Sequence, residues 1–533
     1  MKMANKEKLK ARSSSGVFVL IFLGIMVLVN VMSVQIFGRL DLTENNEFSL
    51  SDASKAIMKN LDDQVLAKAY FTQDLPAPYN QNAAFLKDLF EEYQAYAGGK
   101  FRFEFIDPGE DEQIKMELSM SGIPPVQIQV LENDEFKVKQ VAMGIVFYYA
   151  DKKESIPVVK STSGLEYEIT SLIRKLTSDK LKTVGFLQGH GEPSLQQNMS
   201  EASKMIQKNY ATRDLILGEN DSIPDDIDTL VIISPKEKLS EKALYEIDQF
   251  IMKGKTAAFL VDRYDVDLQQ FNAKPLDTGI EELLKNYGIT LNSELVLDVQ
   301  NKRINVATQQ GMMQIRNIIN YPYIPVITDF KEGSTLLSGM EALSFPFMSS
   351  LQVAASTPKI EYEILAQTSP RSWAAPATES PNPMQRHVPT ETSKMGPFPV
   401  IVSASGNFTS RYASADSSKE GLEFLENANP IPESTESRIL VVADGNFMQD
   451  DFLDGPNLVF FVNIIDWLCQ DESLISIRGR GVTDRPLEPL ENWEKNVIKY
   501  FNLLGIPLLL IAYGFLRFAL RRARKSGLAA GNR

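Results

Sequence analysis

The sequence contains very little of the two residue types that most often build catalytic and metal sites. Its 533 residues include one cysteine, Cys469, and two histidines, His190 and His387. A single cysteine excludes an intrachain disulfide framework and leaves almost no material for a Cys/His zinc site or a Cys–His catalytic pair. We therefore expect no catalytic residue, no metal and no cofactor.

Several motifs of enzymes and nucleotide-binding proteins are also missing. No segment follows the full Gly-x4-Gly-Lys-Ser/Thr order of a phosphate-binding loop, and the hydroxyl-rich stretch 160–164 does not replace it. No Gly-x-Ser-x-Gly turn is present. The chain is therefore not expected to hydrolyse ATP or to act through a serine nucleophile of that type.

The net charge argues against a nucleic-acid partner. The chain has 55 Lys and Arg residues against 69 Asp and Glu residues, a formal charge of −14. Binding to phosphate backbones requires clustered cations, which this balance does not favour. The content of hydrophobic residues, 44%, is that of a globular chain, and the length predicts about three folded units.

Two uncharged segments stand near the ends of the chain. Residues 16–37 form a run of 22 residues without a charge, enough to cross a bilayer core of about 30 Å as a helix. A cleaved signal peptide is the alternative, but its apolar region is usually only about 7–15 residues long. Residues 500–516 form a shorter uncharged run of 17 residues, and the apolar stretch continues past Arg517 to residue 520; a buried terminal helix is the alternative. We predict a transmembrane helix at each end.

The charges that flank these segments predict the topology. Residues 1–15 hold five cations against one acid, and residues 517–533 hold six cations and no acid. The rest of the chain holds 44 cations and 68 acids, a charge of −24. By the positive-inside rule the basic tails, 1–15 and 521–533, are cytoplasmic. We expect a protein of the bacterial inner membrane with two spans, whose main domain is periplasmic.

Residues 38–160 predict a membrane-proximal α/β domain. Alternation and helical spacing indicate the order strand, helix, strand, helix and then three strands, over Val65–Phe71, Asn80–Ala97, Phe101–Ile106, Glu112–Ser121, Val126–Val130, Gly144–Tyr149 and Ser155–Val159. This order, with a proline before the third strand, is similar to a thioredoxin-type fold. The stretch 74–79 has no Cys-x-x-Cys pair, so we expect a docking or spacing module without redox chemistry.

Residues 161–490 predict a second α/β domain with a doubly wound parallel sheet. The strands expected are Lys182–Leu187, Thr229–Ile233, Thr256–Val261 and Arg438–Ala443, with helices between them. The region of about 266–437 is expected to be inserted between the third and fourth of these strands. Within it, 369–395 is rich in Pro, Ser and Thr and predicts an exposed loop with His387 facing solvent.

The candidate site lies in the loop that follows the first of these strands. Gly189, His190, Gly191 and Glu192 occupy a position where ligands gather in doubly wound sheets. The two glycines would let a ligand approach the backbone, and His190 and Glu192 would contact it. A tight turn in which His190 caps a helix or pairs with Glu192 is the structural alternative. Asp262 follows another strand and is a further candidate, although most acidic runs are solvated surfaces.

Five stretches of the chain resemble the auxiliary ABC-transporter components typified by the gliding-motility protein GldG. They are Arg39–Ser51, Glu91–Pro108, Gly164–Leu176, Val184–Glu192 and Asn496–Arg522. The resemblance implies an extracytoplasmic subunit that works with a separate multi-span permease and a cytoplasmic ATPase. It also implies an amidotransferase-like sheet, whose glutaminase activity would need a cysteine nucleophile after a strand. Cys469 is instead expected in a late helix, so the resemblance does not extend to that activity.

We therefore predict a non-catalytic, membrane-anchored subunit of an ABC transporter complex that engages an extracytoplasmic substrate or envelope partner. The alternatives are a structural envelope scaffold and an anchored carbohydrate-active hydrolase that uses paired carboxylates near Glu192. The sequence identifies neither the substrate nor the direction of transport, and motility remains a property of the family name alone.

Overall fold

The computed structural model describes residues 49–478, with short gaps at 74, 78, 110, 133–134, 179, 219–220, 311–312, 377, 419, 427 and 471, and isolated residues beyond 478. The predicted segments 1–15, 16–37 and 521–533 lie outside the described residues, as does 500–520 except for isolated positions. Among the helices that are described, none has both the length and the apolar character needed to cross a membrane. The chain divides into the units Met1–Val482 and Thr483–Arg533, and every element below belongs to the first.

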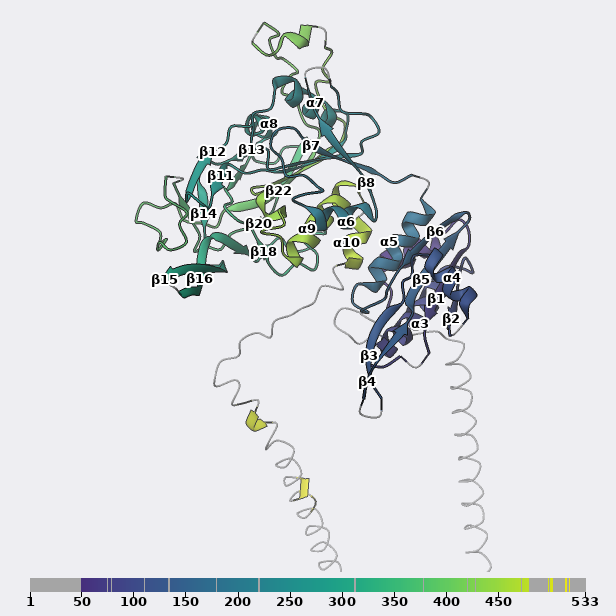
Figure 1. Cartoon of the computed structure of the whole chain (residues 1–533). Coiled ribbons are helices and arrows are strands. Elements are labelled where there is room, and N and C mark those ends of the chain that lie inside the picture. The colour runs from purple at the N-terminus through teal and green to yellow at the C-terminus, as the bar shows by residue number, and fades with distance from the viewer. Residues whose placement is uncertain are drawn as a thin grey trace, which may run out of the picture. The chain divides into compact units, whose positions relative to one another are not determined.

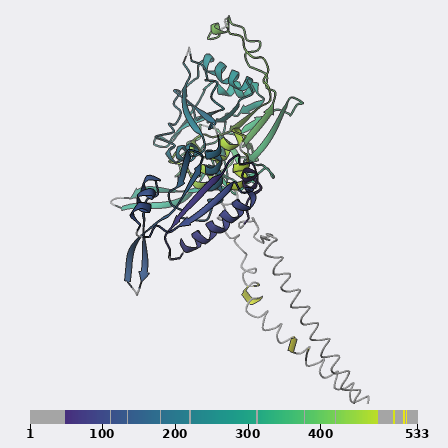
Figure 2. The ribbon, with the colours of Figure 1, turned by 90° about the vertical axis from the view of Figure 1, so that its right-hand side faces the viewer.

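The amino-terminal part of this unit is an α/β region built on a four-stranded sheet. Its helices are α2 (Asp52–Lys59), α3 (Tyr79–Tyr96), α4 (Glu112–Met120) and α5 (Leu165–Thr177). Its strands are β1 (Val65–Phe71), β2 (Phe101–Ile106), β3 (Val126–Glu132), β4 (Glu135–Val141), β5 (Met143–Tyr149) and β6 (Lys152–Ile156). The sheet has the order β2-β1-β5-β6, in which β1 and β2 are parallel and the other pairs are antiparallel. The β3–β4 hairpin extends from it as a separate ribbon (Figure 1 and Figure 2).

Amphipathic helices cover this sheet because their apolar residues recur at helical spacing. In α3, Leu86, Phe90 and Tyr93 are buried, and the Phe90 ring lies 5.6 Å from that of Phe101 in β2. The α2 helix begins where the Ser51 side chain accepts a hydrogen bond from the Ser54 N–H, as an N-cap residue does.

Helix α5 belongs to the core of this first region. Leu165, Ile169 and Ile173 are buried against β1, β5 and α3, and the Glu166 carboxylate accepts hydrogen bonds from the hydroxyl groups of Ser51 and Ser54, at 2.7 Å and 2.6 Å. We predicted a domain boundary at residue 160, which places this helix in the second domain. The structure corrects that assignment, because the apolar stripe of α5 is buried here and not against the larger sheet.

The carboxy-terminal part is built on an eight-stranded sheet of order β17-β20-β22-β23-β10-β9-β7-β8. The strands are β7 (Thr183–Gln188), β8 (Ala211–Ile216), β9 (Thr229–Ile233), β10 (Thr256–Leu260), β17 (Asp329–Phe330), β20 (Ile360–Gln367), β22 (Pro399–Gly406) and β23 (Ser437–Val442). Strands β8, β7, β9, β10 and β23 are parallel, while β22, β20 and β17 continue the sheet in antiparallel pairs. The sheet is therefore mixed, and three of its strands come from the region 266–437 that was expected to be inserted.

Helices cover both faces of this sheet. They are α6 (Ser200–Gln207) and α9 (Gly455–Leu468) on one face, and α7 (Glu241–Met252) and α8 (Ile280–Asn286) on the other (Figure 1). Alternate residues of each strand point to opposite faces, so Val231 and Ile233 of β9 meet the first layer while Leu230 and Ile232 meet the second. Helix α10 (Glu472–Arg478) follows α9. Strand β8, which follows α6, was not predicted from the sequence.

Small sheets and turns complete the region. They are formed by β11 (Tyr264–Asp267) with β12 (Asn272–Pro275), β13 (Ile289–Leu291) with β19 (Leu351–Val353), β14 (Leu295–Leu297) with β21 (Trp373–Ala375), and β15 (Asn301–Gln310) with β16 (Met313–Ile327) and β18 (Leu343–Ser344). Two short 3-10 helices are η1 (Glu423–Glu426) and η2 (Asn446–Met448). The β13–β19 pair packs against β22, on the face of the large sheet that α7 and α8 cover.

Candidate functional site

The order of the parallel strands places a topological switch point between β7 and β9. In chain order the five strands are β7, β8, β9, β10 and β23, and they lie side by side in the order two, one, three, four, five. The connections from β7 and β9 therefore leave in opposite directions along the sheet, which is the point where doubly wound folds bind ligands. The loops that leave β7, β9, β10 and β23 all carry polar residues at this edge.

Six of these residues form a contiguous group, which we call the switch-point cluster. Its members follow the carboxyl ends of four neighbouring parallel strands and are His190, Glu192, Ser234, Lys236, Asp262 and Asp444.

The loop after β7 is a tight turn built on two glycines. Gly189 and Gly191 have φ angles of +105° and +83°, which residues with a Cβ rarely adopt. The turn lets the His190 N–H donate to Glu192 Oε2 at 2.6 Å and brings His190 Nδ1 to 3.4 Å from Glu192 Oε1. The His190 carbonyl in turn accepts a hydrogen bond from the Lys236 N–H at 2.8 Å. The β7 and β9 loops are therefore joined through their backbones.

Lys236 connects this turn to the carboxylate that follows β10. Its Nζ lies 3.1 Å from Asp262 Oδ2 and 3.6 Å from Asp265 Oδ1, and Asp262 Oδ1 accepts the Gly445 N–H at 2.8 Å. Burial opposes ionisation of Asp262, but the charge of Lys236 and the Gly445 hydrogen bond outweigh it and lower the pKa of Asp262. Asp262 is thus a buried, ionised partner of a lysine.

Asp444 has the opposite character although it lies beside Asp262. Its side chain is fully buried, and its Oδ1 accepts the Asn446 N–H at 2.9 Å. Burial, together with the negative charge of Asp262, raises the pKa of Asp444 well above its ordinary value. Two adjacent buried carboxyl groups with pKa values pushed apart in this way share one proton at neutral pH.

Ser234 occupies a strained position at the end of β9. Its φ angle is +46°, in the left-handed region that non-glycine residues rarely adopt. Gly445 packs against it so closely that a Cβ on residue 445 would lie 3.0 Å from Ser234 N and 2.5 Å from Leu260 O. The loops after β9 and β23 therefore interlock, and strain of this kind tends to gather at functional sites.

The polar side chains of the cluster contact one another. The Asp262 carboxylate is hydrogen-bonded by the side chains of Ser234 and Asp444, which helps to lower its pKa. His190 Nδ1 faces Glu192 Oε1 within the turn after β7. The structure thus contains the pairing of His190 with Glu192 that the sequence offered as the structural alternative.

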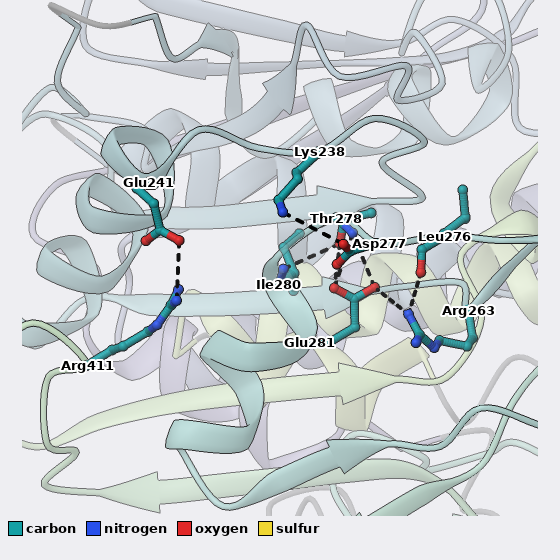
Figure 3. A network of polar contacts seen from close by, with 9 residues as sticks. All are labelled: Lys238, Glu241, Arg263, Leu276, Asp277, Thr278, Ile280, Glu281 and Arg411. Carbon is teal, nitrogen blue, oxygen red and sulfur yellow. Dashed lines mark hydrogen bonds and ion pairs between the residues drawn. The ribbon is translucent and has the colours of Figure 1, made fainter. Parts of the chain in front are cut away.

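A network of polar contacts next to the cluster fixes the loops that carry it (Figure 3). Arg263, which follows Asp262, lies 3.3 Å from Glu281 Oε1, and Glu281 Oε2 accepts the Thr278 hydroxyl at 3.1 Å. Lys238, two residues after Lys236, lies 3.7 Å from Asp277 at the exposed end of the network. The loops after β9 and β10 are therefore tied to the start of α8.

The structure places all five predicted site residues, Gly189, His190, Gly191, Glu192 and Asp262, at this one edge of the sheet. Whether they contact a ligand remains a prediction. Ser234, Lys236 and Asp444 were missed, although each lies within three residues of the end of a buried strand, which is the signal that would have found them. No group of three His, Cys, Asp or Glu side chains in the described part of the chain is arranged to hold a metal ion.

The second histidine does not face solvent as the sequence predicted. His387 is buried, with Nδ1 2.8 Å from Glu379 Oε1, Nε2 2.9 Å from the Asn382 carbonyl, and its ring 4.9 Å from that of Tyr323. Its partners all lie within the loop 369–395 or on β16. This histidine therefore holds the proline-rich loop against the β15–β16 sheet.

A cavity of about 450 Å³ lies in the first region, at the carboxyl ends of β1 and β2. Phe71, Leu75, Ala83, Phe105 and Ile106 contribute apolar walls. The cavity occupies the place where a thioredoxin-type fold carries its redox pair, and the residues around it provide no thiol.

Comparisons with known proteins cover both parts of the chain. Residues 181–470, which carry the whole switch-point cluster, match the family described as "ABC-type uncharacterized transport system". Residues 44–148 match a domain of unknown function. A Borreliella burgdorferi protein described as "Uncharacterized protein" is 23% identical over 539 residues, which cover 98% of this chain and 99% of that protein. A solved structure, "mmIFT52 N-terminal domain", is similar over 54% of this chain and 97% of its own, with 15% identity and a TM-score of 0.32.

Proposed function

Because the chain belongs to the family of ABC-type uncharacterized transport systems and is therefore an auxiliary component associated with an ABC transporter, we propose that it is a binding subunit of the transporter complex. In this role it is non-catalytic. It engages a substrate or an envelope partner on the outer side of the membrane and leaves ATP hydrolysis and transport to other subunits.

The observation that carries this proposal is the switch-point cluster. It lies inside the segment that matches the family, and it combines a strained Ser234 with two buried carboxyl groups, Asp262 and Asp444, whose pKa values are shifted in opposite directions. Convergent polar groups with perturbed pKa values at a switch point are typical of binding sites. The cluster has no cysteine, and we propose that it binds without transforming what it binds.

The proposal includes the two membrane anchors. In this arrangement, helices over 16–37 and 500–520 hold the chain in the bacterial inner membrane and contact a multi-span permease, whose cytoplasmic partner is the ATPase. The support is the length of the two uncharged runs and the basic tails beside them. Within the family, the matching stretches listed above favour a component of the GldG type.

Fold likeness is a further part of the proposal. We infer a thioredoxin-like fold for the first region, because its strands lie in the order two, one, three, four with the parallel pair at one side, when the β3–β4 hairpin is set apart. We infer an amidotransferase- or flavodoxin-like core for the second, from its five parallel strands in the order two, one, three, four, five.

Isolation from its own cells tests the assignment. The full chain, carrying an affinity tag and extracted in mild detergent, is purified and its partners are identified by mass spectrometry. We expect a multi-span permease and an ATPase in amounts comparable to the chain itself. Repeated isolation without either subunit would overturn the proposal, and crosslinking before extraction guards against loss of a weak partner.

A further inference from the structure

We propose that two copies of the chain associate through the outer edges of their β2 strands, which pair in antiparallel fashion about a twofold axis. The two four-stranded sheets then form one continuous sheet. This inference goes beyond the proposed function, because the residues that carry it lie in the amino-terminal region and not in the switch-point cluster.

Strand β2 is the outermost strand of the four-stranded sheet, and its outer edge is open. The sheet has the order β2-β1-β5-β6, so β2 pairs on one side only, with β1 (Figure 1). In the described part of the chain, no further strand or loop forms a backbone hydrogen bond with residues 101–106. An edge of this kind presents unpaired N–H and C=O groups to which another strand can pair.

The sequence of β2 separates aromatic from charged side chains. Alternate residues of a strand point to opposite faces of the sheet. Phe101, Phe103 and Phe105 therefore lie on one face, and Arg102 and Glu104 lie on the other. A strand that pairs with β2 meets an apolar row on one face and two opposite charges on the other.

The phenylalanine row is covered only in part by its own chain. The rings of Phe101, Phe103 and Phe105 lie 5.6, 5.4 and 6.2 Å from the ring of Phe90 in α3. Phe101 is buried, Phe103 is half-buried and Phe105 is 38% exposed. A large ring exposed on an edge strand is apolar surface that a neighbouring strand covers.

The charges of β2 are complementary to themselves in one register. Arg102 and Glu104 are both exposed, and neither forms an ion pair within the described part of the chain. When the twofold axis passes through Phe103, Arg102 lies opposite the second copy's Glu104, and this pair occurs twice. The same register places Phe101 opposite the second copy's Phe105. Opposite charges and aromatic pairs in these positions stabilise antiparallel strands.

The neighbouring registers are disfavoured. Opposite residues of paired strands point to the same face, so the axis passes through a residue and not between two residues. An axis through Arg102 places this arginine opposite its own copy, and an axis through Glu104 does the same for the glutamate. Like charges directly opposite each other are destabilising. Charge complementarity therefore selects a second copy of this chain in the register centred on Phe103.

Disulfide crosslinking of the full chain, in membranes of the cells that produce it, tests the pairing and its register. Phe103→Cys should give a crosslinked dimer with copper phenanthroline, because Cβ atoms of opposite residues are about 4.5–5.5 Å apart. Phe105→Cys should not, because the two copies of residue 105 are four residues apart along the strands, about 13 Å. The wild type, whose single Cys469 is buried, is the control.

Charge exchange tests the same register without relying on a substituted phenylalanine. The mass of the full chain in detergent is measured by light scattering over a range of concentrations. Arg102→Glu places like charges opposite each other twice, and we expect dimerisation about tenfold weaker. Glu104→Arg combined with Arg102→Glu restores both pairs and should restore the dimer. Arg213→Glu is the matched control, because Arg213 is an exposed residue of β8, the edge strand of the larger sheet.

Four outcomes would overturn the inference: a monomeric wild type, equal crosslinking of Phe103→Cys and Phe105→Cys, a dimer that Arg102→Glu leaves unchanged, or crosslinks from residue 103 to another protein only. A double variant that stays as weak as Arg102→Glu would also contradict the register. The proposed function fails separately, since isolation with or without a permease and an ATPase does not depend on whether β2 pairs with a second copy.

Discussion

At the scale of single residues, two neighbouring buried carboxyl groups of this protein differ in protonation. Asp262 is held ionised by Lys236, and Asp444 is held protonated by burial and by the charge of Asp262. The difference arises from which of the two lies next to the lysine, since both are almost completely removed from water. The free energy of unfolding should therefore depend on pH through Asp444.

Replacing Asp444 with asparagine should change the pH dependence of stability. The unfolded carboxyl has a pKa of about 3.9, and the folded one is raised, so both states are protonated below about pH 4. As the pH rises, only the unfolded carboxyl ionises, and the wild type loses stability by about 1.4 kcal/mol per pH unit until the folded pKa is reached. The Asp444→Asn variant has no ionisable group at this position, so its free energy of unfolding should not decrease in this way.

Urea unfolding at a series of pH values checks this expectation. The free energy of unfolding of Asp444→Asn minus that of the wild type should increase from pH 4 toward neutrality. Asp262 is present in both proteins, and because its pKa is lowered, the stability that it contributes is lost only below about pH 4, outside the range compared. A difference that decreases with pH would contradict the assignment of the proton to Asp444.

Gly445→Ala should destabilise the fold through steric overlap alone. The φ angle of Gly445 is −122°, which alanine tolerates, but the added Cβ would lie 2.5 Å from the Leu260 carbonyl oxygen, which the sheet holds in place. We expect a loss of about 1–3 kcal/mol. Gly455→Ala is the control, since a Cβ there meets no atom within 4 Å, and its melting temperature should be unchanged or slightly raised.

At the scale of elements, a buried carboxylate attaches a long surface segment to a helix. Asp248 of α7 accepts hydrogen bonds from the Tyr287 hydroxyl at 2.8 Å, the Ser410 hydroxyl at 2.6 Å and the Arg411 N–H at 3.1 Å. Tyr412 and Phe424 then pack on Tyr245 of the same helix. The segment 410–434 has little regular structure, so side-chain contacts of this kind determine its path.

Asp248→Ala should release this segment. Loss of the carboxylate leaves two hydroxyl groups and one backbone N–H without an acceptor, and we expect a cost of about 3 kcal/mol. Hydrogen exchange followed by mass spectrometry should show faster exchange over 408–434 while β9 and β10 stay protected. Tyr287→Phe removes one of the four donors, which include the Gln249 side-chain amide, and should cost about 1 kcal/mol. Equal effects of the two variants would argue against Asp248 as the central acceptor.

At the scale of the whole folded unit, one arginine joins its two regions. The Arg478 guanidinium in α10 contacts Asp466 at 2.6 Å and the side chain of Asn463, both in α9, and it stacks 4.3 Å above the ring of Tyr167 in α5. Tyr210 donates to the other oxygen of Asp466 at 2.7 Å. The contact of Arg478 with Tyr167 therefore links α5 of the amino-terminal region to the larger sheet region, and the buried ion pair with Asp466 holds the guanidinium in place.

Arg478→Met should weaken the joint between the two regions. It leaves Asp466 buried without its cation, at a cost of about 3–5 kcal/mol. We expect thermal unfolding of the full chain to separate into two transitions. Calorimetry, or fluorescence recorded at two wavelengths, would detect them. Asp466→Asn added to Arg478→Met removes the unpaired charge and should restore part of the loss; no restoration would show that packing of Arg478, and not its charge, holds the regions together.

Much of the architecture follows from local sequence patterns, and the exceptions have identifiable causes. The predicted strands Val65–Phe71, Phe101–Ile106 and Thr229–Ile233 carry the same bounds in the structure, because β-branched and aromatic residues lie between clear turn signals. Strand β8 was missed because Ala211–Ile216 is an edge strand with mostly exposed side chains, which lacks the usual hydrophobic pattern.

The sequence by itself determined the scarcity of cysteine and histidine, the acidic middle between basic ends, and the candidate loop at Gly189–Glu192, because these are properties of residue type and order. Only the tertiary structure decided that Ser234, Lys236, Asp262 and Asp444 meet that loop. Asp444 lies more than 180 residues after Asp262 along the chain, and it reaches the site because β23 pairs with β10 after the chain has formed strands β11 to β22. The pairing of distant strands has no local signature, so the opposite pKa shifts of Asp262 and Asp444 could not be predicted from the sequence.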